Sequence, residues 1–370
     1  MIDPLFFLKI CKEKGFSSFY GVPDSTLKHF CTAATDDEEL KHTICVNEGA
    51  AVGAAIGYHL STAGVPVVYM QNSGLGNAVN PLTSLVAKEI YSIPMLLVIG
   101  WRGEPGVKDE PQHKFQGRIT CEMLQNLEIP FSVIDENSEI ESELFKAVSF
   151  FQNHDSPYAL LIKKGTFSEY TAKENSTGRA YPLSRQKTVE CIVKAQTENT
   201  VIVATTGMAS RELFHTRKEN KISHGTDFLT VGGMGHASSI ALGIAANSPD
   251  KKVICLDGDG ACLMHLGAMA TIGSSGINNL IHIVINNGEH GSTGGQPTVA
   301  REIDLCEIAR ACGYSTAARV DSEETLDKKL AEAENLCFLE VMTNNSKSKD
   351  IGRPTSTPLE NKKMFMENFR

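Results

Sequence analysis

Short, continuous apolar runs recur along the chain, without the alternation of apolar and polar residues typical of one-sided sheets. The clearest four are Val65–Met70, Met95–Ile99, Val253–Leu256 and Leu280–Ile285. Continuous runs are typical of parallel strands covered on both faces. Two stretches rich in alanine and glycine, Gly49–Ser61 and Gly235–Ala246, predict helices that pack closely. Strands that alternate with helices indicate an α/β fold.

This pattern occurs twice, 186 positions apart. The matched pairs include Gly49 with Gly235, Gly57 with Gly243, Val67 with Val253, Gly74 with Gly260 and Ile99 with Ile285. We therefore expect two homologous, doubly wound parallel-sheet domains. The polar segment Gly165–Arg185 is typical of a linker. The expected organisation is a first domain at 1–168, a linker at 169–182, a second domain at 183–345 and a C-terminal extension at 346–370.

Composition narrows the class of protein. A chain of 370 residues is long enough for two domains with their own cores. The formal net charge is −9 and no basic stripe is present, which argues against nucleic acid as a partner. Ten cysteines without a C-x-x-C pair are expected to be buried and reduced. Without a basic leader at Met1–Lys9, or an apolar run of about 18 residues, we expect a cytoplasmic protein outside membranes.

The two copies differ in the loop that follows their first strand. The second copy reads Asp257-Gly258-Asp259-Gly260-Ala261 where the first reads Gln71-Asn72-Ser73-Gly74. Glycines let a phosphate approach the backbone, and Asp259 offers a hard oxygen ligand, although this loop alone could be a turn capped by Asp. Asn287 follows the next strand, 28 positions after Asp259. Because the carboxyl ends of neighbouring parallel strands share one crevice, the pair predicts a magnesium and diphosphate site.

Glu48 in the first copy aligns with Met234 in the second, and each stands just before a small-residue helix. A carboxylate at this place is either an N-terminal cap or a catalytic group, and the residue alone does not decide between them. Met234 taken alone could be an ordinary core methionine.

Gly258-Asp259-Gly260 followed by Asn286-Asn287 resembles the signature of thiamine-diphosphate enzymes. The resemblance implies that Asp259, Asn287 and the backbone carbonyl of Glu289 hold magnesium. It also implies that Glu48 acts on the cofactor pyrimidine, while Met234 and the Gly232 carbonyl hold the cofactor in its bent conformation. The expected cofactor contacts are Glu48, Thr206, Gly207, Met208, Gly232, Met234, Gly258, Asp259, Gly260, Ala261 and Asn287, with a simple strand–helix turn as the alternative at 206–208. In these enzymes the cofactor bridges two subunits, which implies a homodimer or larger homo-oligomer.

The linker leaves no room for the extra middle domain of pyruvate decarboxylase and acetolactate synthase. Two-domain chains resemble the phosphonopyruvate and sulfopyruvate decarboxylases, and several strings favour the phosphonate family. They include Tyr20–Ser25, Asn72–Asn77, Gly100–Gly106, Asp109–His113, Thr206–Glu212, His290–Gln296 and Gly352–Thr355. The resemblance implies decarboxylation of 3-phosphonopyruvate to phosphonoacetaldehyde, a step of phosphonate biosynthesis; sulfopyruvate is the alternative substrate.

A phosphonate requires cationic or backbone donors in the cleft. The candidate substrate contacts are Asp24, Arg102, Gln112, His113 and Arg353, with Lys108 as a further cation. A solvated surface role is as compatible with each arginine as an anion contact. His113 and His290 are candidate proton carriers, and a structural role for each stays open.

Three alternative functions fit these residues less well. A dehydrogenase would need G-x-G-x-x-G at a βα turn, and Leu263 stands where its third glycine belongs. A calcium loop at Asp257-x-Asp259-Gly260 lacks the later ligand positions. A non-catalytic, thiamine-diphosphate-binding regulatory protein would keep Asp259 and Asn287 but have no need of Glu48.

Overall fold

The computed structural model describes residues 1–173, 181–291, 293–346 and 351–370. The chain forms two compact units. The first contains Met1–Ser176 together with His290–Pro297, and the second contains Thr177–Glu289 and Thr298–Arg370. Residues 174–180 of the expected linker and 347–350 of the expected extension lie outside the described residues.

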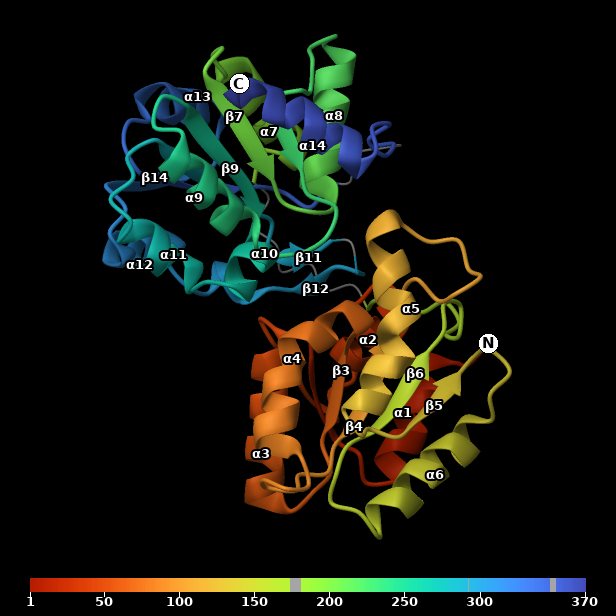
Figure 1. Ribbon diagram of the computed structural model, residues 1–370. Helices are drawn as coiled ribbons and strands as arrows, with labels where there is room; N and C mark the ends of the chain where they lie inside the picture. Colours follow the sequence, from red (N-terminus) through yellow and green to blue (C-terminus); the bar gives the residue numbers. More distant parts are fainter. Residues whose placement is uncertain (174–180, 292, 347–350) are drawn as a thin grey trace. The chain divides into compact units, whose positions relative to one another are not determined.

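The first unit is a six-stranded parallel sheet in the order β2-β1-β3-β4-β6-β5. Its strands are β1 (Ser18–Gly21), β2 (Lys41–Ile44), β3 (Val67–Gln71), β4 (Leu96–Gly100), β5 (Phe131–Ile134) and β6 (Tyr158–Ile162). Its helices are α1 (Pro4–Glu13), α2 (Lys28–Asp36), α3 (Glu48–Thr62), α4 (Leu75–Pro81), α5 (Pro111–Asn126) and α6 (Ile140–Phe151), which cover both faces of the sheet (Figure 1).

Burial on both faces explains the continuous apolar runs. In β3, Val67 and Tyr69 join one buried cluster, while Val68 and Met70 join a second cluster on the opposite face. Successive side chains of a strand point to opposite faces, so a strand covered on both sides needs an apolar residue at every position.

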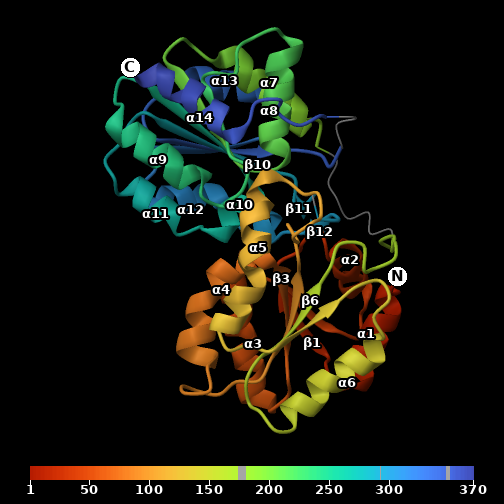
Figure 2. The same ribbon diagram turned by 45° about the vertical axis from the view of Figure 1, so that its right-hand side comes forward.

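The second unit repeats this architecture. Its strands are β7 (Thr200–Ala204), β8 (Asp227–Leu229), β9 (Lys252–Gly258), β10 (Leu280–Asn286), β13 (Thr316–Val320) and β14 (Cys337–Met342), in the order β13-β14-β10-β9-β7-β8. Its helices are α7 (Arg185–Ala195), α8 (Met208–Glu219), α9 (Ala237–Asn247), α10 (Asp259–Met264), α11 (Ala268–Gly273), α12 (Leu305–Cys312), α13 (Glu323–Glu332) and α14 (Pro358–Met366) (Figure 2). Read from β8, the order matches that of the first sheet read from β2. The expected fold class, two homologous parallel-sheet domains, is confirmed.

Two segments depart from this repeat. A small pairing of β11 (Glu289–His290) with β12 (Gln296–Pro297) follows β10, and most of it belongs to the first unit. The C-terminal helix α14 packs on β8, where Asn361 accepts from Leu229 N at 3.0 Å and donates to the Asp227 carbonyl at 2.8 Å. The extension is therefore an integral part of the second unit.

All ten cysteines are unpaired, and all except Cys121 and Cys312 are buried, as expected. No helix among the described residues has the length and apolar character needed to cross a membrane. The cytoplasmic location stays a prediction.

Candidate functional site

The predicted metal residues lie at the switch point of the second sheet. The chain runs from β7 outward to β8 and then returns to β9 on the other side of β7. Open α/β sheets bind ligands outside the carboxyl ends of their strands at such a point. Gly207 follows β7, Asp259 follows β9 and Asn287 follows β10, so three adjacent parallel strands deliver their loops to one edge.

Asp259 is buried, with only 4 % of its surface exposed. One carboxylate oxygen accepts from Gly260 N at 2.9 Å, and the other accepts from Gly288 N at 3.0 Å and from the Thr298 hydroxyl at 2.7 Å. Burial raises the pKa of Asp259 to about 6, although these hydrogen bonds oppose the rise. A bound cation would relieve the cost of burying this charge.

The neighbouring groups provide oxygen atoms of the kind that magnesium prefers. Asn287 is buried, and its amide oxygen lies 3.3 Å from Glu289 N, which donates to it. The Glu289 carboxylate accepts from Asn345 at 2.8 Å, so the expected ligand from this residue is its backbone carbonyl. One carboxylate, one amide oxygen and one carbonyl form a hard donor set that fits Mg²⁺.

Glycines leave space for a phosphate at the same edge. A Cβ on Gly207 or Gly258 would meet no atom within 4 Å. Gly207 has φ of +93° and caps the N-terminus of α8, a helix of 12 residues. Free backbone N–H groups at such a helix start favour an anion. Thr206 and Met208 beside it are half-buried, whereas Gly260 and Ala261 are buried in α10.

Gly232 and Met234 lie in the turn before α9, which begins at Ala237, two residues later than expected. Met234 is half-buried, so it is not the ordinary core methionine considered from the sequence. A partly exposed methionine here is available to contact a ligand, as the resemblance implies.

Glu48 is the first residue of α3, but it is not the cap. The side chain of Asn47 caps the helix by accepting from Ala50 N at 2.8 Å. The Glu48 carboxylate is 5 % exposed and accepts from the Asn77 amide at 2.7 Å. The capping alternative is therefore wrong, which leaves the Glu48 carboxylate available for chemistry.

Gly74 determines where the Glu48 side chain lies. A Cβ on Gly74 would fall 2.6 Å from both Cγ and Cδ of Glu48, closer than non-bonded atoms approach. We expect Gly74→Ala to displace the carboxylate by about 1 Å and to reduce turnover of the reaction that the resemblance implies about a hundredfold. Steady-state kinetics of the purified variant tests this expectation.

Gly76→Ala is the matched control for that substitution. Gly76 lies two residues further on, in α4, and a Cβ there would meet nothing within 4 Å. Alanine is a better helix former than glycine, and a Cβ at this position does not reach Glu48, so this variant should keep far more turnover than Gly74→Ala once gel filtration shows that it keeps the oligomeric state of the wild type. Equal activity of both variants would contradict the account of Glu48.

Asp24 and Arg102 lie together at the switch point of the first sheet. Asp24 is buried after β1, and it accepts from the Gln71 amide and from Leu27 N at 3.1 Å. Burial raises the pKa of Asp24, while Gln71 and Arg102 oppose the rise.

Arg102 follows β4, forms a bidentate ion pair with Asp109 and donates to Ser25 at 2.7 Å. Burial alone would raise the pKa of Asp109, but Arg102 and two backbone N–H groups hold it well below its usual range.

The other substrate candidates are spread over both units. Gln112 and His113 lie half-buried in the first turn of α5. Lys108 is exposed in the preceding loop, and Arg353 is exposed in the second unit. The structure therefore groups Asp24, Arg102 and His113 in one unit without Arg353.

The two candidate proton carriers are neutral near pH 7. Burial, assisted by the charge of Arg102, lowers the pKa of His113. Burial lowers the pKa of His290 to about 4. A neutral imidazole has one ring N–H and one acceptor nitrogen, so each histidine can donate or accept a hydrogen bond at this pH.

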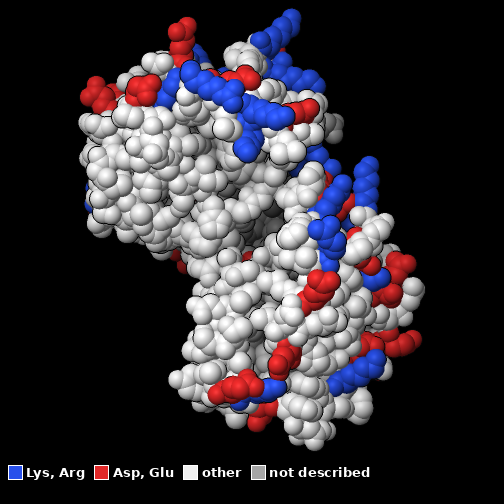
Figure 3. All heavy atoms as spheres, viewed as in Figure 1, with Lys and Arg blue, Asp and Glu red and all other residues white. Residues whose placement is uncertain are grey.

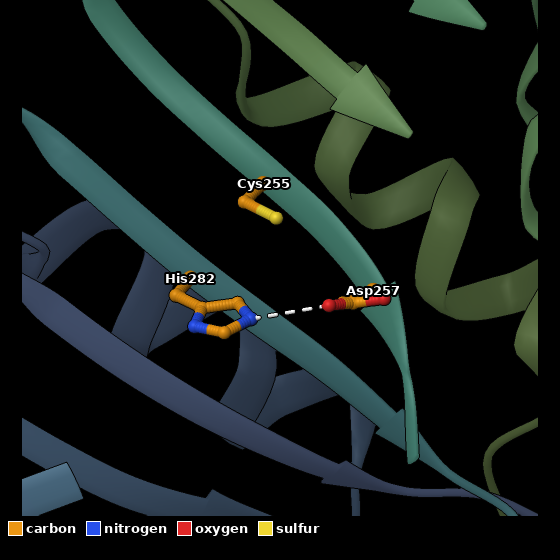
Figure 4. A group of neighbouring side chains, drawn as sticks. All are labelled: Cys255, Asp257 and His282. Atoms are coloured by element: carbon orange, nitrogen blue, oxygen red, sulfur yellow. Dashed lines mark ion pairs between the residues drawn. The ribbon is translucent and has the colours of Figure 1, made fainter. Parts of the chain in front are cut away.

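One face of the second sheet carries a buried polar cluster that the sequence analysis did not predict. Cys255 and Asp257 on β9 and His282 on β10 lie on the same face of the sheet (Figure 4). The His282 imidazole lies 3.5 Å from the Asp257 carboxylate and 3.1 Å from the Tyr314 hydroxyl. Asp257 also accepts from Gly258 N at 3.0 Å, so this pair contacts the backbone that leads to Asp259.

Sequence reasoning also missed Asn77, which holds Glu48, and Thr298, which holds Asp259. Asn77 lies within a string of residues that supported the family resemblance, so its position carried a signal. Thr298 lies 39 positions from Asp259, and no motif links the two residues.

Two family models match the chain. The thiamine pyrophosphate enzyme N-terminal TPP binding domain matches residues 6–124, and the corresponding C-terminal TPP binding domain matches residues 203–341. These ranges contain Glu48 and the pair Asp259 and Asn287, respectively.

Curated relatives match nearly the whole chain. A phosphonopyruvate decarboxylase of Streptomyces viridochromogenes is 33% identical over 369 positions, covering 95% of this chain and 91% of that protein. One from Streptomyces hygroscopicus is 32% identical over 372 positions, covering 95% and 90%. A sulfopyruvate decarboxylase of Methanosarcina acetivorans is 28% identical over 387 positions, covering 98% and 96%.

Proposed function

The chain belongs to the thiamine pyrophosphate enzymes, within the phosphonopyruvate decarboxylase family, and we propose that it converts 3-phosphonopyruvate to phosphonoacetaldehyde and CO₂. One observation supports this proposal above the others. The chain has both a buried Glu48 carboxylate, whose position is set by Gly74 and Asn77, and the pair Asp259 and Asn287 at the switch point of the second sheet. The product is a phosphonate aldehyde, which suits phosphonate biosynthesis.

We infer the following roles for the residues of the chain. Asp259, Asn287 and the carbonyl of Glu289 hold Mg²⁺, and the backbone at Thr206–Met208 binds the diphosphate. Thiamine diphosphate, when bound, supplies the carbon nucleophile and the electron sink that decarboxylation requires. Glu48 holds a proton at the pyrimidine ring, and Asn77 fixes the orientation of its carboxylate.

We propose Arg102 as the cation that binds the phosphonate group. Its guanidinium is held by Asp109 and Ser25 at the carboxyl end of β4, so it is already ordered for a tetrahedral anion. Asp24, Gln112 and His113 are the polar groups proposed around it, and His113 and His290 are the groups proposed to donate a proton during the reaction or to orient the substrate carboxylate. Arg353, exposed in the second unit, is the other arginine proposed to contact the substrate.

The substrate proposal is tested by aldehyde release from phosphonopyruvate, sulfopyruvate and pyruvate at matched concentrations, with thiamine diphosphate and Mg²⁺. We expect phosphonopyruvate to be preferred, and Arg102→Gln to lower kcat/KM for it about 10–100-fold, the loss expected for one charge-assisted hydrogen bond. Turnover of pyruvate should change much less, because pyruvate has no second anionic group.

Arg118→Gln is the control, because Arg118 lies over the Phe115 ring on the exposed face of α5. Preference for sulfopyruvate would be consistent with the proposed cofactor and the role of Glu48, but it would contradict the proposed substrate. Turnover of none of the three acids would instead support the alternative of a non-catalytic, thiamine-diphosphate-binding regulatory protein.

We also propose a homodimer or larger homo-oligomer with the active site at the subunit interface. Each unit carries only part of the catalytic equipment, Glu48 in one and the metal residues in the other. Figure 3 shows that the surface over α3 and α4, and that over α9 and α11, is nearly free of charged side chains. Uncharged faces over helices rich in alanine and glycine, such as α3 and α9, suit close packing against a second copy.

A further inference from the structure

A carboxylate is buried in the middle of the second sheet, where a strand covered on both faces needs only apolar residues. Glu340 lies on β14 between Leu339 and Val341 and is fully buried, with 0 % of its surface exposed. Burying a charge is costly, and an apolar residue of similar volume would usually serve the sheet as well. The carboxylate therefore calls for an explanation beyond packing.

Both oxygens of Glu340 have partners. Oε1 accepts from the Asn286 amide at 2.8 Å, and Oε2 accepts from Arg319 Nε at 2.6 Å. A carboxylate can only accept hydrogen bonds, so Glu340 requires the NH₂ group of Asn286 to face it. The same NH₂ group donates to the Ala300 carbonyl at 3.3 Å, while the Asn286 oxygen is buried and has no hydrogen-bond partner among the described residues. The orientation of this amide is thus fixed by Glu340.

Asn286 is the last residue of β10, and the next three residues all belong to the proposed metal site. Asn287 and the Glu289 carbonyl are its proposed ligands, and Gly288 N donates to Asp259 at 3.0 Å. The Asn286 carbonyl also accepts from Thr343 N at 3.0 Å, which fixes the end of β10 to the end of β14. The contacts that fix the position of Asn286 therefore also fix the start of the proposed metal-binding segment 287–289.

We propose that Glu340 is a positioning residue that acts through Asn286 to hold the segment Asn287–Glu289 in its metal-binding geometry. The inference deepens the proposed function and rests on it, because the metal site itself is part of that proposal. Outer partners that orient metal ligands commonly change metal affinity 10–100-fold when they are removed.

The pair allows an exchange that conserves net charge. In Asn286→Asp, two carboxylates face each other in a buried site, which is strongly unfavourable. In Glu340→Gln, the single remaining oxygen can accept from Arg319 or from Asn286 but not from both, so Asn286 loses its acceptor whenever that oxygen faces Arg319. In the double variant, the glutamine oxygen can accept from Arg319 while its NH₂ group donates to the new aspartate. The hydrogen bond between the two side chains is restored in the reverse direction, and the longer one to the Ala300 carbonyl, at 3.3 Å, is the contact that this variant loses.

The experiment measures the Mg²⁺ concentration that half-saturates thiamine diphosphate binding to the purified full-length protein, by isothermal titration calorimetry. We expect it to rise at least about tenfold in Asn286→Asp and about threefold or more in Glu340→Gln. The double variant should return to within about threefold of the wild type. If Asn286→Asp fails to fold, Glu340→Gln and the double variant still provide the comparison.

Asn279→Asp is the control for a merely structural effect. Asn279 stands just before β10, at its other end, and its amide donates to the carbonyls of Ala245, Ser248 and Lys251 at 2.9–3.1 Å. This variant should lower the unfolding temperature without metal but leave Mg²⁺ half-saturation unchanged. Unchanged half-saturation in Glu340→Gln, or no recovery in the double variant, would overturn the inference. Failure of the wild type to bind thiamine diphosphate with Mg²⁺ would instead overturn the proposed function.

Discussion

Replacing Glu48 with glutamine is expected to reduce decarboxylase turnover about 10²–10⁴-fold, the range for loss of a positioned proton-transfer group. Glutamine has nearly the same shape and can still accept a hydrogen bond from Asn77, which donates to Glu48 at 2.7 Å. It cannot, however, hold a proton at the pyrimidine ring. The measurement is kcat with saturating thiamine diphosphate, Mg²⁺ and phosphonopyruvate.

Binding must be separated from chemistry in this experiment. Because Asp259 and Asn287 are untouched, thiamine diphosphate should bind to Glu48→Gln within a few-fold of the wild-type affinity. Glu122→Gln, on the exposed face of α5 in the same unit, serves as the control and should be fully active. Near-normal turnover in Glu48→Gln would show that Glu48 is not the catalytic acid.

Asp259→Asn is expected to weaken Mg²⁺-dependent binding of thiamine diphosphate by more than about a hundredfold, because even an outer partner of a metal ligand is worth 10–100-fold. The amide keeps an oxygen for Gly260 N or Thr298 but loses the negative charge that attracts the cation. Activity should fall with binding and recover in part at high Mg²⁺.

This loss should occur without damage to the fold. Burial raises the pKa of Asp259 to about 6, which means that the metal-free protein holds the charged carboxylate at a cost. A neutral isostere removes that cost but leaves the backbone N–H of Gly260 or of Gly288 facing the amide NH₂ group, so the unfolding temperature of metal-free Asp259→Asn should stay close to that of the wild type. Asp250→Asn, in the exposed turn before β9, is the control for a general charge effect. Tight Mg²⁺-dependent binding in Asp259→Asn would contradict the metal assignment.

Much of the fold was accessible from the sequence because its signals are local or repeated. The continuous apolar runs followed from burial of both faces of each sheet, as the two clusters around β3 illustrate. The duplication 186 positions apart led to two domains of the same fold, and the two sheets do share one strand order. Each half of the metal motif is a short segment at a strand end, so sequence spacing was enough to relate Asp259 to Asn287.

Side-chain contacts between residues distant in the chain could not be predicted from the sequence in the same way. Periodicity shows that a strand is buried but not which residue of another strand it meets, because that depends on strand order and register. Glu340 interrupts the apolar run of β14, and only the register of β10 with β14 reveals that it reaches Asn286. Arg102 was a plausible free cation in the sequence, yet the folded chain pairs it with Asp109.

The sequence by itself determined the fold class, the duplicated domains and the residues that relate this chain to the thiamine pyrophosphate enzymes, since each depends on local pattern or on spacing along the chain. Only the tertiary structure decided that Asn47 rather than Glu48 caps α3, that Gly74 and Asn77 hold the Glu48 carboxylate, and that His290–Pro297 joins the first unit. The cap depends on the backbone conformation at the start of α3, and the other two features depend on contacts between residues far apart in the chain. Such contacts form when strands and helices pack in one particular order, which local propensity does not encode.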